Sequence, residues 1–147
     1  MNIQTHISFK YKSREEILLR ECIVLSGLVT QKQLDEIKVL YNKNVPYHNF
    51  LHALTVAQNV LQLSTKTYSI IEVQSLFFAA LFHDAGHTGI AETLDEFRSL
   101  DMAFQGILDF EKKYNIQDID YSIVRKAIMG TVFKNRSKNI NKYALLL

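Results

Sequence analysis

The strongest constraint on the fold is a run of seven consecutive apolar residues, Leu76–Phe82, that leads directly into His83 and Asp84. Upstream of the run, Ser69 and Glu72 stand three positions apart, which is the spacing of a capping box at a helix start. A helix that is apolar all round belongs in the centre of a domain. The sequence therefore predicts a buried central helix that ends on a histidine and a carboxylate.

Signals for helices also dominate the rest of the chain. Capping pairs, apolar residues at helical spacing and the scarcity of proline all favour helices, and no alternating strand pattern persists. We therefore expect an all-α fold, with residues 1–147 forming a single compact domain of about six to seven helices. The predicted helices follow Ser13, Thr30, Asn49 and Ser69, span about 92–113 and 120–133, and include a short one near Asn139.

Composition limits the partners that we expect. The net charge of +2 does not call for a nucleic-acid partner, and no apolar run approaches the roughly 20 residues that span a bilayer. The N-terminus lacks the layout of a signal peptide, and the lone Cys22 favours a reducing compartment and a buried, inert thiol. We expect a cytoplasmic protein with no membrane partner, and the sequence does not specify an oligomeric state.

Four of the five histidines fall within forty residues, as His48-x-x-x-His52 and His83-Asp84-x-x-His87. Burying imidazoles and a carboxylate is costly unless they are paired, and both are good ligands for divalent metals. A cation would also relieve the unfavourable position of Asp84 at a helix C-terminus. His48 and His52 share one helical face if the helix begins before His48. A metal site is the leading hypothesis, although each histidine alone could be an ordinary core or loop residue, as we expect for His6.

These residues carry a resemblance to a known family. The segments His48-Asn49-x-x-His52-Ala53 and Ala79-Ala80-Leu81-Phe82-His83-Asp84-x-x-His87-x-Gly89 resemble the HD-domain metal-dependent phosphohydrolases. Within that family they are most similar to the branch that contains the cyclic nucleotide phosphodiesterases. The resemblance is close over about residues 45–103 and includes Glu96-x-x-Ser99, although Asp95 stands where an asparagine is common.

The resemblance implies a role for each site residue. His52, His83 and Asp84 would hold a first metal, a transition metal such as Zn, Mn or Fe, and Asp84 would bridge to a second, Mg or Mn. His48 would be the general acid in the hydrolysis of a phosphate ester, a nucleotide or cyclic nucleotide phosphodiester, attacked by metal-bound hydroxide. His87 would fix the attacking water or a ligand. Glu96 would orient His48 or would simply be a solvated helix charge.

One departure from the family pattern concerns the fourth metal ligand. HD domains supply an aspartate from a downstream helix, often within a run Leu-x-Asp-Ala-Asp-Leu. Here the final residues, Lys142–Leu147, resemble the lead-in to such a run, and the last aspartate in the sequence is Asp120. We therefore expect a domain truncated before its last metal ligand, an incomplete gene product, or a longer chain with a disordered tail. Metal affinity and turnover should then be low.

Two alternatives to a working enzyme remain. The chain could be a non-catalytic HD module that binds metal or nucleotide without turnover. It could also be a purely structural helical protein with histidines in its core, which would bind no metal and would not respond to a chelator.

Overall fold

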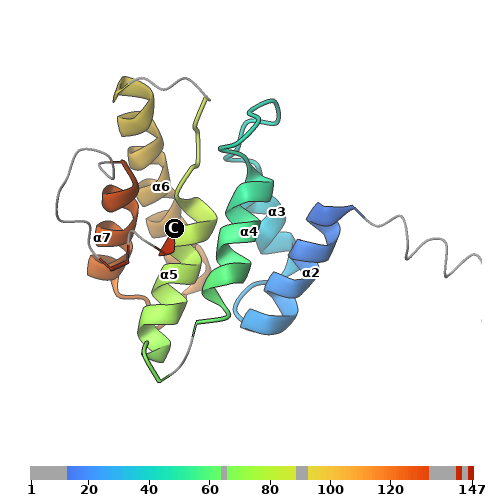
Figure 1. Ribbon diagram of the computed structural model, residues 1–147, viewed down its shortest axis with the longest axis vertical. Helices are drawn as coiled ribbons and strands as arrows, with labels where there is room; N and C mark the ends of the chain where they lie inside the picture. Colours follow the sequence, from blue (N-terminus) through green and yellow to red (C-terminus); the bar gives the residue numbers. More distant parts are fainter. Residues whose placement is uncertain (1–12, 64–65, 89–92, 133–141, 144–145) are drawn as a thin grey trace, which may run out of the picture.

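The computed structural model describes residues 13–63, 66–88, 93–132, 142–143 and 146–147, and of residues 93–96 and 132 it describes the backbone only. Its six helices, drawn in Figure 1, confirm the all-α prediction, and no strand occurs within these ranges. None of the described helices is long and apolar enough to cross a membrane. The helices are α2 (Arg14–Ser26), α3 (Gln31–Lys38), α4 (Phe50–Val60), α5 (Ile70–Phe82), α6 (Thr93–Tyr114) and α7 (Tyr121–Val132).

The first four described helices begin after the residues that the sequence predicted, Ser13, Thr30, Asn49 and Ser69. The side chains of Ser13, Thr30, Asn49 and Ser69 each accept a hydrogen bond from the backbone N–H three residues further on. At Thr30 and Ser69 the reciprocal bond is also present, so both are complete capping boxes. These caps satisfy N–H groups that a helix start would otherwise leave unpaired. Gly89, the last residue of the family motif, and the predicted short helix near Asn139 lie outside the described residues.

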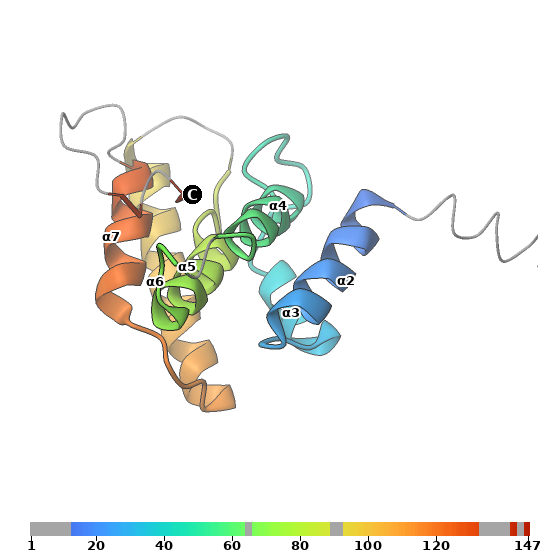
Figure 2. The ribbon, with the colours of Figure 1, turned by 60° about the horizontal axis from the view of Figure 1, so that its bottom comes forward.

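Helix α5 is the central element of the fold, as its apolar sequence predicted. It packs against α4, α6 and α7, while α2 and α3 lie beyond α4 on the opposite side from α6 and α7 (Figures 1 and 2). Every residue from Ser75 to Phe82 is buried. The rings of Phe78 and Phe82 both pack on Phe110 of α6, at centroid distances of 5.9 and 5.8 Å. The C-terminal end of α5 is therefore held between helices on both sides.

Cys22 of α2 has no access to solvent and donates its thiol hydrogen toward the carbonyl oxygen of Leu54, at 3.7 Å. Burial, assisted by the charge of Glu21, raises the pKa of this thiol to about 12. A thiol with so high a pKa forms little nucleophilic thiolate near neutral pH. The expected buried and inert cysteine is thus what the structure contains.

Truncating a central ring should test the dependence of the fold on α5. Phe77 is fully buried, so we expect Phe77→Ala to lower the free energy of unfolding by about 3–5 kcal/mol through lost burial and a residual cavity. Ile70→Ala on the same helix is the control, because Ile70 is 68% exposed and its loss should matter by no more than about 0.5 kcal/mol. Urea unfolding followed by circular dichroism measures both. Equal effects would contradict the placement of Phe77.

Candidate metal centre

The turn after α5 brings three of the clustered residues together. His83 caps the helix, the Ala85 N–H donates to the carbonyl of Phe82 at 3.0 Å, and the His87 N–H donates to the carbonyl of Asp84 at 3.1 Å. The chain can reverse here because Gly86 adopts a φ of +73°, which a residue without Cβ reaches at little cost. His83, Asp84 and His87 are all buried in this turn.

The turn before α4 and the first turn of α4 itself supply the other two histidines, His48 and His52. The Asn49 side-chain amide donates to the carbonyls of Val45 and Pro46 at 3.0 and 3.3 Å, and its oxygen accepts from the His52 N–H at 2.9 Å. Since Asn49 is the cap, α4 begins at Phe50 and His48 precedes the helix. His48 and His52 therefore do not share a helical face, and their rings lie nearly perpendicular at a centroid distance of 6.5 Å.

The packing of α4 on α5 places His52 against the turn after α5. One ligand atom each from His52, His83 and Asp84 can be chosen so that all three lie within 4.8 Å of one another. The His83 Nδ1 is 2.6 Å from the Ala80 carbonyl oxygen, which can only accept, so Nδ1 carries the proton. The free Nε2 is then 3.2 Å from Asp84 Oδ2. A proton or a cation must separate these two acceptor atoms, and this donor set suits a divalent metal.

Electrostatics in the metal-free centre favour a proton on His83. Burial acts to lower the pKa of His83, but the charge of Asp84 and the hydrogen bonds to Asp84 and Ala80 outweigh it, so the pKa is raised. Burial acts to raise the pKa of Asp84, yet His83 and His48 hold it well below its usual range. Burial lowers the pKa of His52, which keeps this imidazole neutral and able to bind a metal.

Of the three predicted catalytic residues, the structure describes the side chains of His48 and His87 but not that of Glu96. His48 Nδ1 lies 3.0 Å from Asp84 Oδ2, and the His87 ring stacks on the His48 ring at 4.0 Å between centroids. The structure thus brings both histidines to the three candidate ligands. Glu96 belongs to α6, but its side chain lies outside the described part of the chain. Asp84, predicted as a metal ligand, is the carboxylate that His48 contacts here.

Sequence reasoning missed several residues around the centre. The exposed ring of Tyr47 lies 4.6 Å from that of His52 and 5.1 Å from that of His48, between centroids. Tyr41 donates a hydrogen bond to the carbonyl of Leu81, near the C-terminal end of α5, and Asn42 donates one to the carbonyl of His87, in the turn that follows. The partners are 40 and 45 positions apart in the sequence. Adjacency to His48 was the one available signal for Tyr47. For Tyr41 and Asn42 there was none, because they follow a helix pattern and belong to no motif.

Comparison with known protein families finds a match in the segment that carries the candidate metal centre. Residues 47–98 match the 3′5′-cyclic nucleotide phosphodiesterase family. This segment is phosphodiesterase-like. It contains all four clustered histidines and Asp84, so the predicted resemblance is confirmed. No solved structure shows a significant match to the chain.

Curated relatives extend the similarity beyond that segment. The dual specificity calcium/calmodulin-dependent 3′,5′-cyclic nucleotide phosphodiesterase 1C of Mus musculus is 34% identical over 88 residues, which are 56% of this chain and 12% of that protein. The 1B enzyme of Bos taurus is 37% identical over 89 residues, which are 56% of this chain and 16% of that protein. The chain thus spans a small part of the relatives that it matches.

Metal affinity should depend on pH. A metal must displace the proton on His83, so affinity should rise as the pH rises through the elevated pKa of that residue. Without metal the sign is opposite: the protonated His83 stabilises the fold at low pH, and this contribution is lost as the pH rises through its folded-state pKa. Calorimetric metal titrations and thermal unfolding without metal, each on both sides of neutrality, measure these trends. Metal affinity that falls with rising pH would contradict the assignment.

A side chain at Gly86 should be tolerated less well than one at Gly27, because the flexible Met102 side chain would have to move aside. A Cβ at Gly86 would meet the Met102 sulfur, in addition to the cost of a φ of +73°. Gly27, at a φ of +62°, is the matched control because its Cβ would meet nothing within 4 Å. Gly27→Ala should lower the free energy of unfolding by about 1–2 kcal/mol and Gly86→Ala by more, with additional loss of metal binding. Chemical unfolding and metal titration of both variants measure the difference, and equal effects would refute the steric argument.

Proposed function

We propose that this chain binds a divalent metal through His52, His83 and Asp84 and hydrolyses a phosphate ester, a nucleotide or cyclic nucleotide phosphodiester. One observation carries the proposal. Ligand atoms of the three residues lie within 4.8 Å of one another, and His48 contacts Asp84 at 3.0 Å, inside the segment that matches the phosphodiesterase family. The family supports phosphodiester hydrolysis in general terms, while the metals and the substrate belong to the proposal.

The donor set accords with a catalytic metal site. Two imidazoles and a carboxylate suit Zn, Mn or Fe, and three protein ligands leave coordination positions open. A bound ion would supply a Lewis acid that polarises water and withdraws charge from phosphate oxygens. Asp84 would also contribute to holding a second, largely hydrated ion, Mg or Mn.

His48 is the proposed general acid. Its Nδ1 contacts Asp84, which orients the ring so that Nε2 can face the leaving oxygen and deliver a proton to it. His87 stacks on one face of this ring and limits its rotation. Glu96 remains our candidate for a second carboxylate that orients His48 during the reaction. We assign residues 1–147 to one domain of this kind and place it in the cytoplasm, as the unpaired Cys22 favours.

A second candidate function is metal or nucleotide binding without turnover. The number of ligands favours it, because the described residues bring three protein ligands to the centre. Binding and hydrolysis must therefore be measured separately.

Hydrolysis can be tested with Mn²⁺, bis(p-nitrophenyl) phosphate and a panel of 3′,5′-cyclic nucleotides. We expect slow, metal-dependent turnover that His83→Ala reduces to background, because this substitution removes a ligand. Asp84→Asn should lower turnover strongly by weakening both the metal site and the contact to His48. Asp109→Asn is the matched control, an exposed aspartate on α6 whose loss should leave the rate unchanged.

The outcomes separate the two candidate functions. Activity that survives His83→Ala would exclude this centre as the catalyst. Metal binding that depends on His83, without turnover on any substrate, would favour the non-catalytic module.

A further inference from the structure

The linker between α3 and α4 is bonded to the metal centre at three consecutive residues. The Leu40 carbonyl accepts from the Gly86 N–H at 2.8 Å, and the Tyr41 hydroxyl donates to the Leu81 carbonyl at 2.6 Å. The Asn42 side-chain amide donates to the His87 carbonyl at 2.9 Å. These bonds reach backbone groups on both sides of the pair His83–Asp84. The linker therefore spans the segment of chain that carries two of the three candidate ligands.

The bond from Tyr41 satisfies a carbonyl that the helix cannot. Leu81 lies in the last turn of α5, where carbonyls lack a partner four residues on, and the Ala85 N–H turns back to Phe82 instead. Tyr41 is buried, so loss of its hydroxyl would leave the Leu81 carbonyl unsatisfied away from water. Burial and the nearby charge of Asp84 raise the pKa of Tyr41 well above its usual range. The hydroxyl therefore stays protonated and remains a donor.

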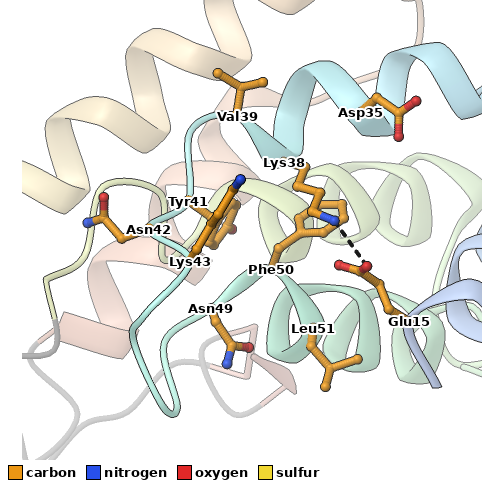
Figure 3. Close-up of a pocket in the computed structure, with 10 residues that line it drawn as sticks. All are labelled: Glu15, Asp35, Lys38, Val39, Tyr41, Asn42, Lys43, Asn49, Phe50 and Leu51. Atoms are coloured by element: carbon orange, nitrogen blue, oxygen red, sulfur yellow. Dashed lines mark hydrogen bonds and ion pairs between the residues drawn. The ribbon is translucent and has the colours of Figure 1, made fainter. Parts of the chain in front are cut away.

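The ring of Tyr41 connects the same site to α4. It packs on Phe50 at 5.6 Å between centroids, and Phe50 begins α4 two positions before His52. Figure 3 shows the other side of this linker, where Tyr41, Asn42 and Phe50 line a pocket of about 820 Å³ between α2, α3 and α4. One residue thus contacts both the end of α5 that carries His83 and the start of α4 that carries His52.

We propose that Tyr41 and Asn42 are positioning residues of the metal centre. They fix the end of α5 and its turn relative to the start of α4, so that His83 and Asp84 meet His52 at ligand distance. Neither residue is one of the three candidate ligands. The inference rests on the metal site of the proposed function and adds to it that the α3–α4 linker sets metal affinity. Outer partners of metal ligands commonly have this effect.

Tyr41→Phe tests the role of the hydroxyl while keeping the ring. Binding of Co²⁺ is followed by calorimetry and by its visible absorption, which reports ligand geometry. We expect the dissociation constant to rise about tenfold or more, with a changed spectrum. The matched control is Tyr143→Phe, because the Tyr143 hydroxyl donates to Glu72 at 2.7 Å near the other end of α5. That end lies roughly 20 Å away along a 13-residue helix, so the control should leave the Co²⁺ affinity and spectrum unchanged.

Asn42→Ala is a second variant that puts the fold at little risk, because Asn42 is exposed. It removes the bond to the His87 carbonyl alone, and we expect the Co²⁺ dissociation constant to rise about 2- to 10-fold, the worth of one hydrogen bond. If Tyr41→Phe does not fold, Asn42→Ala decides the question.

The outcomes are distinct from those of the hydrolysis test. Affinity and spectrum that stay unchanged in the folded linker variants would overturn the inference and leave the proposed function standing. Absence of Co²⁺ binding by the unsubstituted chain would overturn both. Co²⁺ binding that depends on Tyr41, without any hydrolysis, would support the inference and count against turnover only.

Discussion

The candidate site depends on the contacts that the Asp84 carboxylate makes with two histidines. One oxygen, Oδ2, lies 3.0 Å from His48 Nδ1 and 3.2 Å from His83 Nε2, so two histidines from distant segments converge on a single atom. A buried carboxylate at a helix C-terminus is unstable without compensation, since both desolvation and the helix dipole oppose its charge. A proton on a neighbouring histidine or a bound cation is therefore required for this turn to fold as it does.

The apolar body of α5 makes that arrangement rigid. Phe78 and Phe82 are locked against Phe110, and the turn beyond them is held by the linker and by Ser99, whose hydroxyl donates to the Ala85 carbonyl at 2.8 Å. A hydrophobic core is close-packed, so it restrains whatever extends from its edge. Polar groups at the end of a buried apolar helix therefore have fixed positions, which a surface loop would not provide.

Sequence alone predicted the features that depend on neighbouring residues. Caps such as Ser69 and Asn49 act within three positions, and the apolar run of α5 is a local pattern, so the helices and their burial followed from it. The residue types and spacing of the clustered histidines indicated a metal site. Tyr41 could not be found this way, because its partner Leu81 is 40 positions distant and bonds through a backbone carbonyl. The condition for a shared helical face of His48 and His52 is not met, because Asn49 caps the helix and α4 begins only at Phe50.

The same geometry explains why rigidity should matter more here than charge. Without a metal, a proton on His83 already neutralises much of the repulsion between Nε2 and Asp84, so an incoming cation must compete with that proton. Replacing the proton on His83 by a metal cation therefore gains less electrostatic free energy than adding a cation to an unprotonated site would. What remains to favour the metal is the third donor, His52, which contributes only if α4 and α5 keep their relative position. The contacts of Tyr41 with Leu81 and Phe50 join those two helix ends. The proposed metal affinity would therefore depend on how these helices are held together.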